Sequence, residues 1–381
     1  MTQDLRTGSP QPDSSPAPIE ASTGAAGRSG SVMNRVLGSL SAAARLEVFL
    51  IIILAFLVWW GAQLSPFFLT GSNFGFSIQA VMEISIMALA MTPIIITGEI
   101  DLSVESMVGL SSCVLGWLWM EGVPLQLGIP IVLLVGLLGG LFNGFVVTRW
   151  ALPSLVVTLG TLALFRGLAH VVLGSTVVTN FPAEFRDFGF SYVPGTNIPW
   201  TLLAFLILAA VCCAVIHLTW IGRQVFAVGK NKDAARYSGV RVGTLKLALF
   251  AVSGLVAAFA GVILTSRTST ANPDNGLNMT LAVVTIAVLG GVDINGGKGT
   301  IPGVILAVFI LATLKSALTQ AGISTDYQNV AVGLLLIVSV ITPLLARQFR
   351  ILADRIRLGR WRHRLRRGRP ARDPAAGEVV R

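Results

Sequence analysis

Charged residues are scarce in this chain. Asp, Glu, Lys and Arg make up 12% of its 381 residues, while 54% are hydrophobic. An ordinary soluble domain carries about 25% charged residues, so this composition excludes one. The net charge of +10 is concentrated in the segment from Arg347 to Arg381, which holds twelve arginines and three acids. The rest of the chain is almost neutral, so we expect no nucleic-acid binding.

Residues suited to cofactors and covalent chemistry are also few. The three cysteines, Cys113, Cys212 and Cys213, lie in apolar stretches, and the three histidines do not cluster. We therefore predict no disulfide, no metal site and no cofactor. The stretch Gly296–Thr300 is not a phosphate-binding loop, because a glycine follows its lysine where Ser or Thr is required. We expect neither ATP hydrolysis by this chain nor, without a catalytic cluster of His, Ser or Asp, any other enzyme activity.

Long apolar stretches are what the chain has instead. A helix of about 20 residues spans the hydrocarbon of a bilayer, and most of the apolar stretches approach that length. We therefore predict an all-α polytopic membrane protein with about ten transmembrane helices in two five-helix halves. The ten stretches are 46–66, 78–97, 104–120, 126–147, 153–173, 199–219, 244–265, 279–293, 301–319 and 327–345.

The distribution of basic residues predicts the orientation in the membrane. Lys and Arg gather in the cytoplasmic loops of membrane proteins. With residues 1–45 inside, an even number of spans places 24 of the 28 basic residues in the cytoplasm. We expect a disordered cytoplasmic segment at 1–45, a transmembrane domain at 46–345 and a basic cytoplasmic tail at 346–381. The tail either anchors this topology or attracts anionic lipid.

The largest hydrophilic loop follows the sixth apolar stretch, at residues 220–243. It is basic, and we predict a short helix at Lys232–Tyr237 with Asn231 as its N-cap and Gly239 at its end. A short basic helix between two spans suits the docking of a cytoplasmic partner. The alternative is an ordinary loop whose basic residues only set the topology.

Two polar turns interrupt the apolar pattern, at Thr97–Ser103 and at Leu289–Thr300. They lie at mirrored places, between the second and third stretches from each end of the apolar region. Because the adjoining stretches are short, freed backbone groups at these turns suit a transport pathway. The alternative is two well-capped loops, in which Asp101 or Ser103 caps the helix that follows. Each turn has an Asp followed by an apolar and a small polar residue, in Asp101-Leu-Ser103 and Asp293-Ile-Asn295.

Ionisable residues inside the apolar stretches are rare. A charge in lipid is costly, so those that occur are candidates for function. Glu83 lies in the second stretch and Arg166 in the fifth, both in the outer half of the membrane at similar depth, and we predict that they pair. The alternative is that Arg166 extends its side chain to the outer surface. Weaker polar candidates, which alternatively bond only to backbone, are Asn143, Thr158 and Thr161.

Small residues recur at four-residue spacing on two of the stretches. Such ridges let helix backbones approach closely in a membrane. We therefore predict that the fourth and seventh stretches lie in the interior of the bundle. The two ridges are Gly136, Gly140 and Gly144 on the fourth stretch, and Ser253, Ala257 and Gly261 on the seventh.

Four sequence motifs occur together in one order and spacing. They are Gly98–Ser103, Leu152–Thr161 leading into Phe165-Arg-Gly167, Gly222–Asn231, and Val288-Leu-Gly-Gly followed by Gly296–Thr300. With them the chain resembles the permease subunits of bacterial ATP-binding-cassette importers of the ribose, rhamnose and autoinducer-2 type. The resemblance covers about residues 45–345.

This resemblance implies both partners and a location. It implies a permease of the inner membrane that works as a homodimer or heterodimer, with two cytoplasmic ATPase subunits and an extracytoplasmic solute-binding protein. It also implies that loop 220–243 contains the coupling helix that meets the ATPase. Candidate coupling residues in that loop are Gly222, Arg223, Gly229, Asn231, Ala234, Ala235, Ser238 and Gly239.

The sequence therefore predicts the permease subunit of an importer that carries a small neutral sugar or sugar-like solute inward by alternating access. A pathway with few fixed charges suits a neutral polyhydroxy solute better than an ion. The alternative is a stand-alone secondary transporter or channel for a small polar solute, in which Glu83 is the acid to consider. The pathway candidates are Glu83, Asp101, Ser103, Asn143, Thr158, Thr161, Arg166, Asp293 and Asn295.

Overall fold

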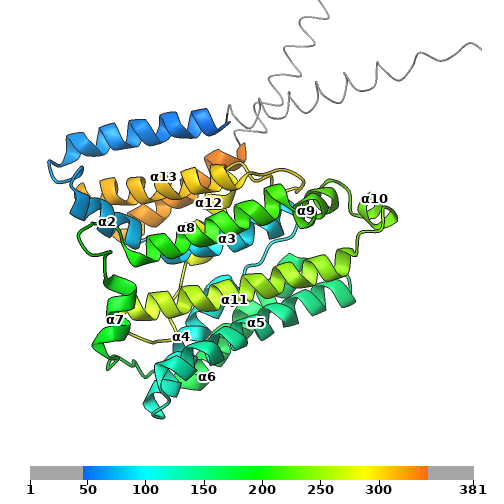
Figure 1. Ribbon diagram of the computed structural model, residues 1–381, viewed down its shortest axis with the longest axis horizontal. Helices are drawn as coiled ribbons and strands as arrows, with labels where there is room; N and C mark the ends of the chain where they lie inside the picture. Colours follow the sequence, from blue (N-terminus) through cyan, green and yellow to red (C-terminus); the bar gives the residue numbers. More distant parts are fainter. Residues whose placement is uncertain (1–45, 342–381) are drawn as a thin grey trace, which may run out of the picture. The chain divides into compact units, whose positions relative to one another are not determined.

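The computed structural model describes residues 46–341, which form an all-helical bundle (Figure 1). The expected N-terminal segment 1–45 and the basic tail 346–381 lie outside the described residues. Within 46–341 the only β pairing is two isolated bridges, Val178 with Ala271 and Tyr192 with Pro199. The helices are Leu46–Leu64, α2 (Gly71–Gln79), α3 (Met82–Ile96), α4 (Val104–Met120), α5 (Leu125–Arg149), α6 (Ser154–Leu173), α7 (Ala183–Phe190), α8 (Trp200–Cys213), the π-helical η1 (Ala214–Leu218), α9 (Trp220–Lys230), α10 (Lys232–Tyr237), α11 (Val242–Thr268), α12 (Met279–Leu289), α13 (Ile301–Gln320) and Thr325–Ile341.

Six of these helices are long and apolar enough to cross a membrane: Leu46–Leu64, α5, α6, α8 with η1, α11 and α13. The pair α2 and α3 makes a seventh candidate span, bent by 53° at its break. The helices α4, α12 and Thr325–Ile341 are apolar but shorter. Each of the ten expected stretches thus contains helix, while the count of ten spans stays a prediction.

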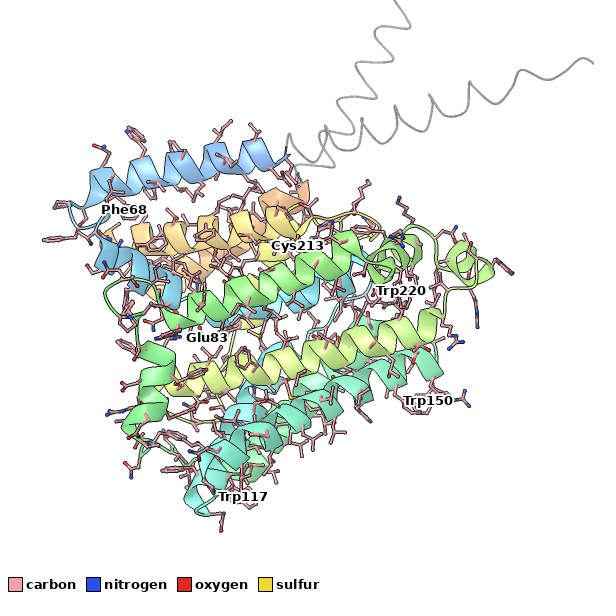
Figure 2. The ribbon with its side chains drawn as sticks, viewed as in Figure 1. Phe68, Glu83, Trp117, Trp150, Cys213 and Trp220 are labelled. Atoms are coloured by element: carbon pink, nitrogen blue, oxygen red, sulfur yellow. The ribbon has the colours of Figure 1, made fainter. Side chains whose placement is uncertain are left out.

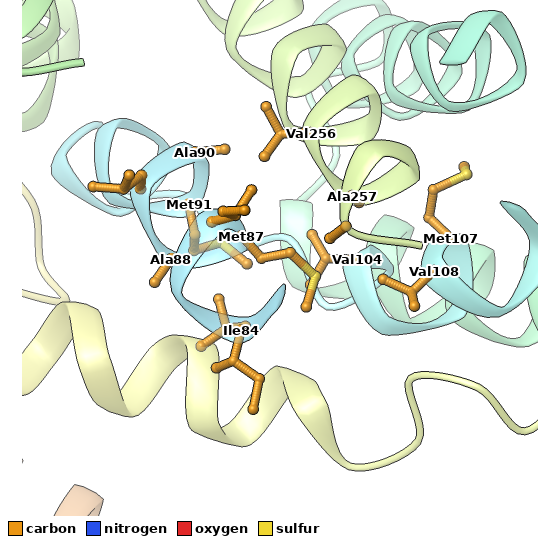
Figure 3. Close-up of a cluster of buried hydrophobic side chains, with 14 of the residues drawn as sticks. Ile84, Met87, Ala88, Ala90, Met91, Val104, Met107, Val108, Val256 and Ala257 are labelled. Atoms are coloured by element: carbon orange, nitrogen blue, oxygen red, sulfur yellow. The ribbon is translucent and has the colours of Figure 1, made fainter. Parts of the chain in front are cut away.

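The burial of the helices separates a central group from a peripheral one. Every residue of α3 is buried, and 67% of the most apolar stretch of α11 and 61% of that of α13 are buried. The peripheral helices expose large apolar side chains, as expected for surfaces that face lipid tails. Figure 3 shows the centre of the core, where α3, α4 and α11 contribute buried apolar side chains, among them Met87 of α3, Val104 of α4 and Ala257 of α11.

Tryptophans lie at both ends of the bundle. Figure 2 shows Trp150 and Trp220 at the end where α9 begins, and Trp117 toward the opposite end. All three side chains are exposed. Trp is enriched at both membrane–water interfaces, so these positions fit a bundle that crosses a bilayer along its long helices.

The glycine ridge of α5 packs directly against the backbone of α11. A methyl group added to Gly136 would lie 2.5 Å from the Gly254 carbonyl oxygen, and one added to Gly140 would lie 2.2 Å from that of Phe250. The ridge of α11 points elsewhere, since a methyl group on Gly261 would lie 2.8 Å from the Val108 oxygen of α4. The interior position predicted from these ridges is correct for α11. It is wrong for α5, where only 28% of the most apolar stretch is buried, because a glycine ridge covers one helix face and leaves the others exposed.

The irregular segment Ser269–Asn278 links α11 to α12 and lies along α4. Asn275 donates a hydrogen bond from Nδ2 to the Ser112 hydroxyl at 2.8 Å. Closer to the start of α4, a methyl group on Gly276 would lie 2.7 Å from the Glu105 carbonyl oxygen. Irregular backbone beside a membrane helix is tolerated where protein covers it, and α4 supplies that cover. Both short apolar helices, α4 and α12, therefore begin after a non-helical segment.

Candidate functional site

The two polar turns meet each other at the last turn of α9. We call this contact the glycine junction and define it as Ile96, Gly98, Gly229, Gly296 and Gly297. The Gly297 amide donates to the Ile96 carbonyl at 2.8 Å. A methyl group on Gly229 would lie 1.8 Å from that same oxygen, and one on Gly296 would lie 3.0 Å from the Gly98 nitrogen. Only glycine backbones fit this closely, so α9 and the two turns are in direct backbone contact here.

The predicted helix after α9 is confirmed with its boundaries. The helix α10 covers Lys232–Tyr237, and the Asn231 carboxamide caps it by accepting a hydrogen bond from the Ala234 amide at 2.9 Å. Gly239 follows it with φ of 86°, a left-handed conformation that suits glycine. Ala235 is buried, whereas Ala234 is exposed and Tyr237 is 92% exposed. Figure 1 shows α10 at the end of the bundle beyond α9.

The other loop candidates divide between packing and exposed positions. Gly222 packs against η1, where a methyl group would lie 1.8 Å from the Ile216 carbonyl oxygen. Arg223 is exposed on α9. The exposed Ser238 donates its hydroxyl proton to the Ala234 carbonyl at 2.9 Å and so closes the end of α10. Between them, α9 and α10 present an exposed surface at this end of the protein.

The carboxylate of Asp101 is the centre of a buried hydrogen-bond network. One oxygen accepts from the Ser103 amide at 3.0 Å and from the Ser103 hydroxyl at 2.6 Å. The other accepts from the Ser253 hydroxyl of α11 at 2.9 Å, and Asn143 of α5 donates to the Ser103 hydroxyl at 2.8 Å. Asp101 is 1% exposed, and this burial raises the pKa of its carboxyl in the turn, against the lowering effect of the hydrogen bonds. Three of the predicted pathway residues, Asp101, Ser103 and Asn143, are thus joined.

Further contacts bind the same turn to α6 and α11. The Ile100 amide donates to the Ser154 hydroxyl at 3.1 Å, and Thr158 donates to the Ile100 carbonyl at 3.3 Å. Thr161 bonds only within α6, to the Thr158 carbonyl at 3.4 Å. Glu99 forms an ion pair with Lys246 of α11. We did not predict this pair, although Glu99 lies in the motif and Lys246 lies at the edge of the basic loop.

The second polar turn is more exposed. One Asp293 oxygen accepts from the Asn295 amide at 3.0 Å and from its side chain at 3.2 Å. The other lies 3.4 Å from the Lys298 ammonium group, whose side chain is 78% exposed. The turn therefore holds its own shape, without a network like that of Asp101 to join it to neighbouring helices.

The predicted ion pair between Glu83 and Arg166 is wrong. Glu83 pairs with Arg267 of α11 at 2.7 Å, and its side chain is 1% exposed. Arg166 instead donates to the backbone carbonyls of Pro273 and Asn275. Similar depth in the membrane did not determine the partner of Glu83. The helix α3 packs beside α11, which brings Glu83 to Arg267. Arg166 is instead reached by the irregular segment that follows α11. Figure 2 shows Glu83 toward the end of the bundle opposite Trp220.

Glu105, in the first turn of α4, is a polar residue that is not among the predicted pathway candidates. Its carboxylate accepts from the Thr280 amide at 3.0 Å, in the first turn of α12. A carboxylate at this place satisfies an otherwise free amide and complements the positive end of the helix dipole. The starts of the two short helices, one from each half of the chain, are therefore in contact. Sequence spacing gives no signal for a cap that comes from a residue 175 positions away.

Long apolar helices, exposed apolar surfaces and tryptophans at both ends define a multi-pass membrane protein with one exposed basic end. The chain belongs to the family described as "Branched-chain amino acid transport system / permease component", which matches residues 73–340. Its relatives include the autoinducer 2 import system permease protein LsrD of Yersinia enterocolitica, 36% identical over 272 residues, and LsrD of Escherichia coli K12, 38% identical over 272 residues. Each alignment covers 70% of this chain and 82% of the relative. No solved structure matches the chain.

The predicted resemblance is thereby confirmed. The protein is the permease component of an ATP-binding-cassette importer, and it is a transport subunit rather than an enzyme.

Proposed function

We propose that this permease imports a small neutral sugar-like solute, with autoinducer 2 as the first candidate, across the inner membrane. The named relatives are autoinducer 2 import permeases, which supports this class of solute. In our proposal it pairs with a second permease subunit and works with two cytoplasmic ATPase subunits and an extracytoplasmic solute-binding protein. In this proposal both termini and α10 lie on the cytoplasmic side of the membrane.

The glycine junction is the observation that supports this coupling most strongly. The exposed helix α10 contacts the ATPase, and α9 continues directly into it through the single residue Asn231. At its last turn, α9 touches the end of α3, at the Ile96 carbonyl, and the second polar turn, at Gly297, through Gly229. Movement of the ATPase therefore displaces α10 and α9 together, and the junction transfers that displacement to the end of α3 and to the turn before α13.

Among the predicted pathway residues, the enclosed ones are best suited to positioning. Asp101 is almost fully enclosed and accepts three hydrogen bonds, so in our proposal it fixes the turn after α3 onto α11 rather than touching solute. Ser103, Asn143 and Thr158 support the same turn. The solute pathway runs beside the contact between α4 and α12, where the side chain of Glu105 is partly exposed.

Docking at α10 is tested by placing a bulky side chain on its exposed face. Ala234→Trp adds an indole where the alanine is exposed, so we expect the protein to fold and insert normally while its ATPase no longer co-purifies. Ala183→Trp is the matched control, because Ala183 is also an exposed alanine in the first residues of a short helix, α7. Since α8 and η1 run between them, α7 and α9 lie at opposite ends of the bundle (Figure 1).

The solute is tested with the complex purified together with its ATPase, reconstituted in vesicles and supplied with its solute-binding protein. ATP-dependent uptake of autoinducer 2, but not of ribose or rhamnose, is the expected result. Uptake of ribose or rhamnose instead would support the proposed importer but show that its solute is a different one. Solute movement without any associated ATPase, unaffected by Ala234→Trp, would overturn the proposal in favour of a secondary transporter.

A further inference from the structure

The last turn of the span that leads into α9 is π-helical. This turn, η1, covers Ala214–Leu218 and widens the helix by one residue. π-Helical turns are rare, and those that occur are often found at functional sites. They change the direction of side chains that a regular helix would place elsewhere. Here the turn carries His217, whose Nε2 accepts a hydrogen bond from the Ile301 amide at 3.2 Å.

That amide belongs to Ile301, the first residue of α13. The backbone amides of residues 301, 303 and 304, in the first turn of this helix, all have hydrogen-bond acceptors. The Gly303 amide bonds to the Thr300 hydroxyl at 3.2 Å and the Val304 amide to the Thr300 carbonyl at 3.3 Å. Pro302 has no amide hydrogen, which leaves only the Ile301 amide. His217 therefore supplies the one acceptor in this first turn that comes from a different element. For Nε2 to accept, the imidazole is neutral and carries its hydrogen on Nδ1.

The π-helical turn and α9 are fixed to each other. The Thr219 hydroxyl, between them, donates to the Val215 carbonyl at 2.6 Å and accepts from the Ile221 amide at 3.2 Å. Gly222 lies so close to the carbonyl of Ile216 that any side chain at position 222 would collide with it. A displacement of α9 consequently carries η1 with it, and with η1 the side chain of His217.

We propose that His217 is a positioning residue that transmits the displacement of α9 to the start of α13. The helix α9, together with the η1 turn fixed to it, then holds the start of α13 at two points: Gly229 contacts Gly297 in the turn before α13, and His217 contacts Ile301, the first residue of α13. With two contacts α9 rotates α13 as well as pushing the turn, which a single contact at the glycine junction cannot do. This inference depends on the proposed coupling role of α9 and adds to it a second point of transmission.

The hydrogen bond is tested first by hydrogen–deuterium exchange of the peptide that contains Ile301, in the purified permease–ATPase complex. His217→Leu removes the acceptor, and we expect exchange to become about fivefold faster, the factor for one hydrogen bond of ordinary strength. His217→Gln should restore slow exchange, because its Oε1 stands as far along the side chain as Nε2. His217→Asn should not, because its Oδ1 is one bond shorter. His170→Leu, at an exposed histidine of α6, is the matched control and should leave this peptide unchanged.

Transmission is tested by the number of solute molecules imported per ATP hydrolysed in reconstituted vesicles. We expect His217→Leu and His217→Asn to lower this ratio, while His217→Gln and His170→Leu keep it and the ATPase stays bound in all four variants. A normal ratio in His217→Leu, with the ATPase bound and exchange at Ile301 accelerated, would overturn this inference and leave the proposed function intact. Absence of a bound ATPase in the unmodified protein would instead overturn the proposed function.

Discussion

Replacing Gly229 by alanine should separate ATPase binding from transport. The added methyl group would lie 1.8 Å from the Ile96 carbonyl oxygen and 2.4 Å from the Gly297 nitrogen, both of them backbone atoms. Neither atom can move aside without displacing its turn. The same methyl group would also disturb the hydrogen bond of 2.8 Å between the Gly297 amide and the Ile96 carbonyl.

The cost follows from these two effects. Overpacking of this kind costs about 1–3 kcal/mol, and a lost hydrogen bond costs about 1 kcal/mol. Together they predict a loss of about 2–4 kcal/mol, or a fall of about 2–5 °C in the melting temperature for a protein of this size. Because α10 lies beyond the junction and keeps its cap, the ATPase should still bind, while solute import per ATP falls.

The assay compares Gly229→Ala with Gly243→Ala in the same detergent and in the same vesicles. Gly243 is an exposed glycine in the first turn of α11, and the nearest atom to an added methyl group there is Thr148 Cβ at 3.9 Å. Alanine at this position should be neutral or stabilising, since alanine is the better helix former by about 1 kcal/mol. If both variants have the same melting temperature and import solute equally well, the glycine junction does not couple the ATPase to transport.

Two further predictions concern the charged residues. Reversing Glu83 to Arg should cost about 3–5 kcal/mol, because it leaves Arg267 facing a like charge in a buried site. The double variant Glu83→Arg with Arg267→Glu should recover part of the lost melting temperature, and a recovery with Arg166→Glu instead would contradict the pairing. For Asp101, a pKa raised by burial means that its protonated form favours the folded state, so stability should fall as pH rises above the ordinary value of 3.8. Asp101→Asn should remove this part of the pH dependence between pH 4 and 8 in melting scans, and an unchanged slope would show that another group causes it.

Local signals in the sequence were sufficient for the long apolar helices and for α10, although not for α2 and α7. Asn231 and Gly239 specify the two ends of α10 through backbone conformations and a cap that depend only on nearby residues. The polar turns were also found from their own residues, because Asp and Gly interrupt an apolar pattern wherever it occurs. That these turns touch each other was not predictable, since their contact depends on the path of α9 between them.

The charged contacts were the least predictable part of the site. Sequence gives the approximate depth of Glu83 but not the direction in which its side chain points around α3. Its partner, Arg267, lies just after the apolar stretch 244–265, where no neighbouring residue indicates a contact with α3. The cap that Glu105 provides for α12 is equally invisible, because it joins residues in different halves of the chain.

The close fit of α5 against α11 limits how this permease can change shape. Where backbones touch without side chains between them, no rotamer change can absorb a slide or a twist of one helix on the other. The two helices consequently share their degrees of freedom, and any reorientation of α11 carries α5 and its lipid-facing surface along. The hinges of the transport cycle must then be sought at contacts made by long side chains, such as Lys246 with Glu99 and Arg267 with Glu83, which can stretch and re-form.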